Sequence, residues 1–169
     1  MSRMLVVYYS VSNGNTRKIA HQMAEYMGAA LAEIQTVQPY VGSYEQIVEQ
    51  GKQEVERGYH PPVRPLPFRL ENFDVIAIGT PTWWYTMAPA VAAFLSMYEW
   101  AGKTVIPFQT YGGWPGHTLK DIKAACKGAK FCCEGKIQFD SSGGSQMVTD
   151  ETEVQRWLQQ IENEVEIIE

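Results

Sequence analysis

Runs of apolar residues recur along the whole chain and predict a series of buried strands. Residues 4–9 (MLVVYY), 73–79 (FDVIAIG) and 104–109 (TVIPFQ) contain few polar positions, as strands covered on both faces do. Shorter apolar runs at 32–37 and 130–133 predict two more strands. The pattern therefore indicates five strands, separated by segments of a different periodicity.

The segments between these runs repeat their apolar residues at helical spacing. Ile19, Met23 and Met27 share one face of the first of them, and the segment beginning at Ser43 opens with a capping box, S-Y-E-Q. Strands that alternate with helices predict an α/β fold, a parallel sheet with helices on both faces. Helices are predicted over residues 16–27, 43–57, 88–100, 118–126 and 151–164.

The length of 169 residues fits one domain, 1–169. Within it, residues 39–72 are long and proline-rich toward their end, so we expect an elaborated crossover lying over the surface. Open parallel sheets bind ligands at the carboxyl ends of their strands, beside a switch in strand order. The loops that follow the three strongest strands are therefore the candidate ligand-binding elements.

Composition excludes several classes of protein. The chain is 45% apolar and 20% charged, with a net charge of −5 and no concentrated basic stretch, which argues against a nucleic-acid binder. No segment approaches the roughly 20 apolar residues of a membrane span, so we expect no membrane association and a cytoplasmic location. Cys126, Cys132 and Cys133 form no C-x-x-C pair and predict reduced structural thiols, and no metal-ligand spacing is present.

The loop after the first strand, residues 10–16 (SVSNGNT), places many polar groups directly before a helix. A helix N-terminus offers unpaired N–H donors and partial positive charge, and Gly14 allows a ligand to approach the backbone closely. Neither G-x-x-x-x-G-K-[ST] nor G-x-G-x-x-G occurs here. The loop predicts a phosphate site, and the alternative is a polar turn that only caps the helix. Its candidate donors are Ser10, Ser12, Asn13, Asn15 and Thr16.

The other two loops are rich in aromatic residues and glycine. Residues 79–89 (GTPTWWYTMAP) contain Trp83 and Trp84; one ring is expected to stack on a planar ligand and the other to pack on a helix or a partner subunit. Residues 110–118 (TYGGWPGHT) leave backbone groups free to contact the edge of a heterocycle. His117 is a weak candidate for a proton donor, with helix capping or exposure to solvent as the alternative.

A ligand with a phosphate, a flat aromatic system and a polar ring edge satisfies all three loops, and flavin mononucleotide (FMN) has these parts. The chain also resembles flavodoxin-like proteins, in particular the branch found in many bacterial genomes near NAD(P)H:quinone reductases. Three blocks carry the resemblance in the family's order, YYSVSNGNTRKIA, FDVIAIGTPTWWYTMAPAVAAFL and GKTVIPFQTYGGWPGHTLKDI. Asn13 is an insertion relative to the family's usual S-x-[ST]-G-N-T loop.

The resemblance implies a five-stranded sheet in the order 2-1-3-4-5 and non-covalent FMN. It implies that residues of the first loop hold the phosphate, and that residues of the other two contact the two sides of the isoalloxazine ring. The phosphate residues would be Ser10, Ser12, Asn13, Gly14, Asn15 and Thr16. The ring contacts would be Pro81, Thr82, Trp83 (the preferred stacking partner) and Trp84 on one side, and Thr110, Tyr111, Gly112 and Gly113 on the other.

Two redox functions remain open. The first is an enzyme that oxidises NAD(P)H and reduces a quinone or a similar acceptor, with the flavin performing the chemistry. The second is a carrier that shuttles electrons between redox partner proteins. Pro81, Thr82 and Trp83 stand where short-chain flavodoxins often have a glycine beside the flavin, which favours the enzyme. A dimer is possible, with Trp84 and Trp100 at its interface if they are exposed.

Overall fold

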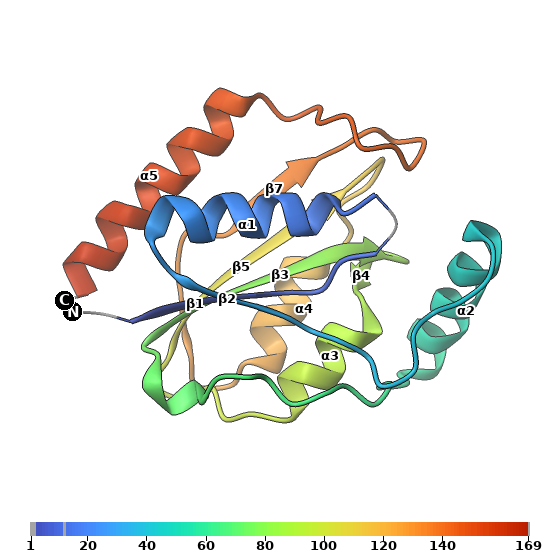
Figure 1. Ribbon diagram of the computed structural model, residues 1–169, viewed down its shortest axis with the longest axis horizontal. Helices are drawn as coiled ribbons and strands as arrows, with labels where there is room; N and C mark the ends of the chain where they lie inside the picture. Colours follow the sequence, from blue (N-terminus) through green and yellow to red (C-terminus); the bar gives the residue numbers. More distant parts are fainter. Residues whose placement is uncertain (1–2, 12, 169) are drawn as a thin grey trace.

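The strongest apolar runs form the middle of a twisted sheet in the computed structural model, which describes residues 3–11 and 13–168 (Figure 1). Helices cover both faces of the sheet, as the alternating pattern predicts. The strands are β1 Met4–Tyr8, β2 Ala30–Glu33, β3 Val75–Trp83, β4 Thr86–Met87, β5 Thr104–Tyr111, β6 Lys130–Phe131 and β7 Gly135–Gln138. The helices are α1 Asn15–Met27, α2 Tyr44–Arg57, α3 Pro89–Ser96, α4 Thr118–Ala125 and α5 Glu151–Ile168, with a 3-10 turn η1 at Leu70–Asn72.

The sheet has seven strands, where the sequence predicts five. Its main path runs β2-β1-β3-β5-β6 in parallel, which confirms the expected order, and β7 pairs with β5 farther along the same edge. The fifth strand, predicted at residues 130–133, is confined to β6, and β7 is an additional strand that follows Cys133, which has a left-handed conformation (φ 55°). The other additional strand, β4, folds back antiparallel onto the end of β3.

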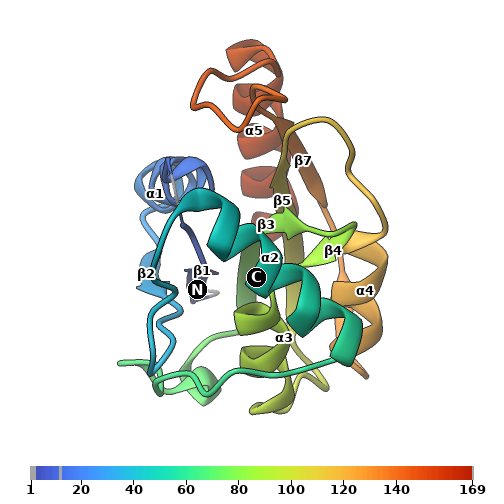
Figure 2. The same cartoon turned by 90° about the vertical axis from the view of Figure 1, so that its right-hand side faces the viewer.

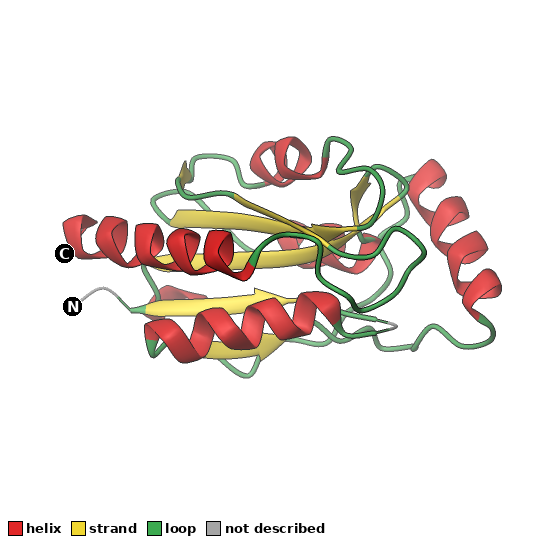
Figure 3. Cartoon of the chain, turned by 90° about the horizontal axis from the view of Figure 1, so that it is seen from above, coloured by secondary structure: helices red, strands yellow, loops and turns green. Residues whose placement is uncertain are grey.

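Alternating residues of each central strand enter two separate cores. Val7 packs with Phe94 and Ile122 beneath α3 and α4, whereas Val6 packs with Ile19 and Leu158 beneath α1 and α5. Figure 3 shows α1 and α5 over the same side of the sheet. Burial on both faces explains why these strands lack polar alternation.

Two predicted boundaries, the end of β3 and the end of α3, are wrong. β3 continues through Trp83, four residues beyond its predicted end at Gly79, because its last residues pair with β4 and β5. α3 ends at Ser96 instead of Trp100. Trp100 is buried and donates a hydrogen bond from its indole nitrogen to the carbonyl oxygen of Leu95 at 2.8 Å, so it does not mark a dimer interface.

The crossover at residues 39–72 is more than a surface connection. Its helix α2 stands across the carboxyl end of the strands, at the right of Figure 1 and in front of the sheet in Figure 2. The predicted capping box is confirmed, with Ser43 and Gln46 exchanging two hydrogen bonds at the start of α2. Within the described ranges 3–11 and 13–168, no helix is long and apolar enough to cross a membrane.

The three cysteines are free, and Cys126 is buried. Burial raises the pKa of the Cys126 thiol to about 12. The pKa of Cys133 is also raised to about 12, mainly by burial and to a smaller extent by the neighbouring Cys132. The thiols are therefore protonated at neutral pH, which is consistent with structural residues.

We expect Ser43→Ala to loosen α2 without unfolding the domain. Loss of this N-cap removes about 1 kcal/mol from the helix, equivalent to a roughly fivefold decrease in the protection of its amides. Hydrogen exchange of residues 47–57, followed by mass spectrometry, measures the change. Ser43→Asp retains a capping oxygen and is the control. Equal protection in the alanine and aspartate variants would show that the box does not stabilise α2.

Candidate functional site

A cleft of about 310 Å³ opens at the carboxyl end of the sheet, within the size range of small-molecule sites. Five chain segments form its walls: the β1–α1 loop, α2, the end of β3, the end of β5 and the loop after β7. The three loops selected from the sequence thus converge on one site. Parallel strands bring them together because their carboxyl ends meet at the same edge of the sheet.

The N-terminus of α1 forms the most polar end of this cleft. Gly14 caps the helix in a left-handed conformation (φ 73°) and contributes no side-chain cap, and the first turn contains no acidic residue. The Ser10 hydroxyl oxygen accepts a hydrogen bond from the backbone N–H of Arg17 at 3.2 Å, so it is engaged within the protein. Ser12, the remaining predicted serine, lies outside the described residues. The helix end therefore presents backbone donors and partial positive charge, with no carboxylate in its own first turn.

Thr16 connects two walls of the cleft. Its side chain is buried, and its hydroxyl lies 2.7 Å from the hydroxyl of Thr110 at the end of β5. Thr82 donates to the carbonyl oxygen of Thr110 at 3.0 Å, so the ends of β3 and β5 are joined by side chains as well as by the strand ladder. Gln109 donates to Thr82 at 2.8 Å and to the Pro115 carbonyl at 2.9 Å, which holds the loop after β5 in place.

Asn13 and Asn15 donate their side-chain amides to the loop after β7. Their acceptors are the carbonyl oxygens of Gly143 and Gly144, the second at 3.0 Å. The Tyr44 hydroxyl of α2 reaches the same loop, since a Cβ built on Gly143 would lie 3.2 Å from it. This loop thus covers the polar end of the cleft, held from the β1–α1 side and approached by α2.

Asp140 shapes the beginning of that covering loop. Its carboxylate accepts hydrogen bonds from the backbone N–H and the hydroxyl of Ser142, at 2.9 and 2.7 Å. The bond from the Ser142 hydroxyl, and to a smaller extent the bond from its backbone N–H, lower the pKa of the Asp140 carboxyl. The aspartate is therefore ionised at neutral pH and stabilises the turn.

Trp83 lines the cleft and also packs against α2. Its ring meets Tyr9 and Tyr40 edge to face, with centroids 6.1 and 5.2 Å away. Gly51 of α2 lies directly against the ring, because a Cβ at this position would be 2.9 Å from the indole carbon Cε3. The sequence predicts that one of the two tryptophans packs on a helix; in the structure both Trp83 and Trp84 contact α2.

A buried carboxylate lies behind this aromatic wall. Glu54 of α2 accepts hydrogen bonds from the Tyr40 hydroxyl at 2.5 Å and from the Gln50 amide at 3.1 Å. Burial, reinforced by the hydrogen bond to Glu54, raises the pKa of Tyr40, and burial together with the charge of Glu54 raises that of Tyr9. Both phenols stay protonated, so Tyr40 remains a donor that ties α2 to the extended segment before it.

The turn between β3 and β4 has an unusual composition. Its two central residues, Trp84 and Tyr85, have φ of 49° and 71°, as in a type I′ turn, where Asn-Gly is the common pair. A left-handed conformation costs a residue with a Cβ about 1–2 kcal/mol. The Trp84 indole donates to the Val48 carbonyl at 3.1 Å, and the Lys52 ammonium lies 5.3 Å from its ring centre. The turn is thereby fastened to α2.

His117 lies outside the cleft lining. It occupies the N-cap position of α4, and its ring is 58% exposed and paired with Asp121. Its neighbours form a separate shallow hollow that includes Lys120 and Glu134. The exposed placement matches the alternative given for this residue, and we assign it no role in the cleft.

Most predicted site residues do line the cleft. Those that do are Asn13, Asn15, Thr16, Pro81, Thr82, Trp83, Trp84, Thr110, Tyr111 and Gly112. Ser10, Gly14 and Gly113 lie nearby without lining it. The lining residues that were not predicted are Val11, Tyr44, Ile47, Val48, Phe139, Asp140, Ser141, Gly143 and Gly144.

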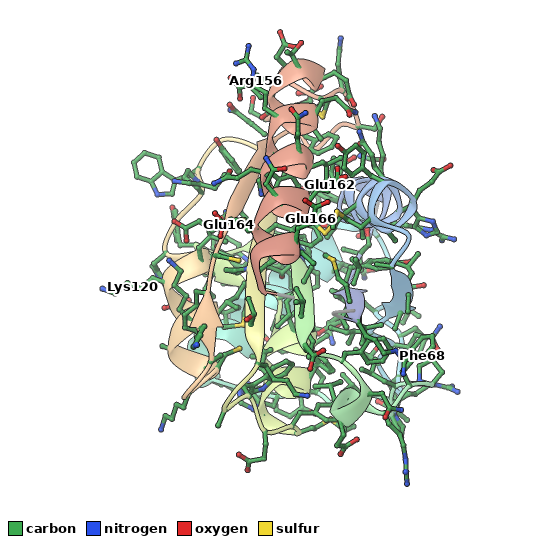
Figure 4. All side chains as sticks on the ribbon, turned by 90° about the vertical axis from the view of Figure 1, so that its left-hand side faces the viewer. Phe68, Lys120, Arg156, Glu162, Glu164 and Glu166 are labelled. Atoms are coloured by element: carbon green, nitrogen blue, oxygen red, sulfur yellow. The ribbon has the colours of Figure 1, made fainter. Side chains whose placement is uncertain are left out.

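Charge is distributed unevenly around the molecule. Arg17, Lys18 and His21 border a shallow hollow beside Asn13 and Gly14, next to the polar end of the cleft. The acidic residues Glu162, Glu164 and Glu166 lie on α5, in the view from the opposite end of the molecule (Figure 4). An anion at the α1 N-terminus therefore lies near cationic side chains and far from these carboxylates, despite the net charge of −5.

Comparisons with known proteins agree with this geometry. Residues 3–161 match the family model described as flavodoxin. A flavoprotein structure from Bacteroides uniformis has a TM-score of 0.76 at 24% identity, covering 94% of this chain and 98% of the other. A flavoprotein from Lactobacillus acidophilus, solved in complex with FMN, has a TM-score of 0.69 at 20% identity, covering 93% and 99%. No curated protein matches the chain.

We expect Gly51→Ala to destabilise the protein, although alanine is the better helix former. Its Cβ would collide with the Trp83 ring, and overpacking of this kind costs about 1–3 kcal/mol. Urea denaturation followed by intrinsic fluorescence measures the loss. Gln53→Ala, on the exposed side of α2, is the matched control and should be nearly neutral. A Gly51→Ala variant as stable as Gln53→Ala would contradict the close packing of Trp83 on α2.

Proposed function

This chain belongs to the FMN-binding flavodoxin family, and we propose that the cleft holds FMN and that the loaded protein is an NAD(P)H-dependent oxidoreductase. Its acceptor would be a quinone or a similar flat molecule. The residues fit the cofactor at both ends: a helix N-terminus whose N-cap residue is a glycine without a side chain at one, and aromatic side chains at the other. The Lactobacillus acidophilus relative, which is solved in complex with FMN, supports the choice of cofactor.

The phosphate would bind at the N-terminus of α1. The backbone N–H groups of the first turn and the hydroxyl of Thr16 would donate to it, and the helix dipole favours its negative charge. Arg17 and Lys18 would add attraction from the adjacent hollow. Asn13 and Asn15, whose amides hold the covering loop, would act on the phosphate indirectly by positioning that loop.

The isoalloxazine ring would lie between the end of β3 and the loop after β5. Trp83 and Trp84 would border it on one side and Tyr111 on the other, with Thr110 and Gly112 contributing backbone groups at its edge. Tyr44, Ile47 and Val48 of α2 would exclude water from the same space. When bound, FMN supplies the capacity to accept two electrons from a nicotinamide and pass them to the acceptor.

The overall reaction balances with one nicotinamide and one quinone. NAD(P)H gives up a hydride, equivalent to two electrons and one proton, and becomes NAD(P)⁺. The quinone gains two electrons and two protons to become a hydroquinone, the second proton coming from solvent. The protein supplies binding and orientation for both molecules in turn.

The position of α2 is the observation that favours an enzyme over a carrier. A carrier exchanges electrons with proteins through an open cofactor edge, whereas α2 and the tryptophans attached to it wall the cleft at the carboxyl end of the sheet. Such a wall suits small molecules that enter the cleft. The alternative is a flavodoxin-type electron carrier, favoured by the strongly exposed ring of Trp114, since exposed apolar side chains often mark protein contacts.

An anaerobic visible spectrum of the FMN-loaded protein distinguishes these functions. For the enzyme, stoichiometric NADPH or NADH should bleach the flavin absorption within seconds, and one equivalent of a quinone should restore it. For a carrier, the spectrum should persist with both nicotinamides and bleach only with dithionite. That second outcome would contradict the proposed enzymatic function while leaving FMN binding intact.

Thr16→Val tests the phosphate site independently. A hydrogen bond to a charged group contributes about 1.5–3 kcal/mol, so FMN affinity should fall roughly tenfold or more. Riboflavin, which lacks the phosphate, should bind the variant and the natural protein equally, as measured by calorimetry. Thr104→Val, at the far end of β5, is the matched control. Equal losses for FMN and riboflavin would place the phosphate elsewhere.

A further inference from the structure

We infer that the aromatic turn Trp84–Tyr85 is the platform on which the flat electron acceptor binds at the mouth of the cleft. This inference rests on the proposed oxidoreductase function and assigns Tyr85 as the residue that receives the acceptor. Trp84 lines the cleft itself, and Tyr85 follows it directly with a ring that is 55% exposed.

The composition of the turn departs from the local preference for this conformation. Both residues occupy left-handed backbone, which glycine or asparagine would adopt with less strain. Tyr85 gains little from burial, because more than half of its side chain faces solvent. A strained residue with an exposed aromatic ring beside a cofactor cleft is more consistent with ligand binding than with stability.

The backbone of the turn is held from two sides. The Tyr85 carbonyl accepts the backbone N–H of His117 at 2.8 Å, and Gly116 packs so closely that a Cβ there would lie 2.2 Å from this carbonyl oxygen. On the other side, the Trp84 indole is bonded to the Val48 carbonyl of α2. The two anchors fix the backbone of the turn, and with it the position from which the Tyr85 side chain extends, before any ligand arrives.

The chemistry of the platform identifies its ligand as a planar aromatic molecule of the quinone class. Phenol and indole rings bind flat molecules by stacking, which adds about two- to tenfold in affinity for each good contact. A molecule stacked at Tyr85 lies beside the cleft wall that Trp84 forms. The same wall borders the position proposed for the isoalloxazine ring, which would keep the acceptor close to its source of electrons.

The test uses the FMN-loaded, oxidised protein with 1,4-naphthoquinone as the probe, without any nicotinamide. Equilibrium dialysis measures the dissociation constant, which should rise roughly three- to tenfold in Tyr85→Asn. Tyr85→Phe retains the ring and should bind the probe within about twofold of the natural protein. Tyr59→Asn removes an exposed tyrosine that lies beyond the C-terminus of α2, away from the β3–β4 turn, and is the matched control.

Thermal unfolding of the same variants provides a second readout that separates binding from structure. Asparagine tolerates the left-handed conformation, so Tyr85→Asn should raise the Tm by about 2–4 °C while it weakens binding of the naphthoquinone probe. A residue with only a structural role would show the opposite, a lower Tm with unchanged binding, and that result would overturn the inference. Equal binding to all variants, or no binding to the natural protein, would also overturn it.

Two further outcomes are distinguishable. If the natural protein is a dimer by size-exclusion chromatography and Tyr85→Asn becomes a monomer, the ring serves an interface between copies and the inference fails. If NADPH does not reduce the flavin but the probe still binds through Tyr85, the proposed source of electrons fails while the acceptor platform stands.

Discussion

The packing of Trp83 against Gly51 determines where α2 lies, and the shape of the cleft depends on that position. A helix in this type of fold ordinarily buries an apolar stripe on a face of the sheet. α2 has few apolar residues and attaches instead through its one internal glycine, its buried Glu54 and the Val48 carbonyl. The side chains that contact α2 at these points are Trp83, Trp84 and Tyr40, and Tyr40 in turn packs against Trp83. Helix and wall therefore form one unit, and a change in either alters the space between them.

This arrangement explains how a helix with few apolar residues becomes a side of the binding site. Its attachments are polar or aromatic contacts at specific atoms, which orient an element more narrowly than a broad apolar surface does. The buried Glu54 depends on hydrogen bonds from Tyr40 and Gln50. Removing either donor would leave a carboxylate poorly satisfied in a buried position, which is costly. The orientation of α2 is thus coupled to groups that never touch the cleft.

The sequence predicts those features whose cause is local. The strands at 4–9, 73–79 and 104–109 are apolar enough to be recognised, and the loops that follow them line the cleft. The Gly143–Gly144 part of the site was not predicted because β7, the strand that leads into it, is only four residues long, alternates in burial and was not recognised in the sequence. Ile47 and Val48 belong to residues 39–72, which the sequence predicts as a crossover lying over the surface. Periodicity shows which residues share a face but not what that face meets.

The departures from local rules concentrate on one side of the cleft. Gly51 lies inside a helix, Trp84 and Tyr85 occupy a turn suited to asparagine and glycine, and Glu54 is a buried charge. The left-handed turn residues and the buried carboxylate lower stability relative to ordinary residues at the same positions, whereas Gly51 is required by its contact with Trp83. The central strands, by contrast, follow expectation and are uniformly apolar. Since local strain persists only where the surroundings hold it, the anchors from Val48, Gly116 and His117 are as much a part of this site as the rings they orient.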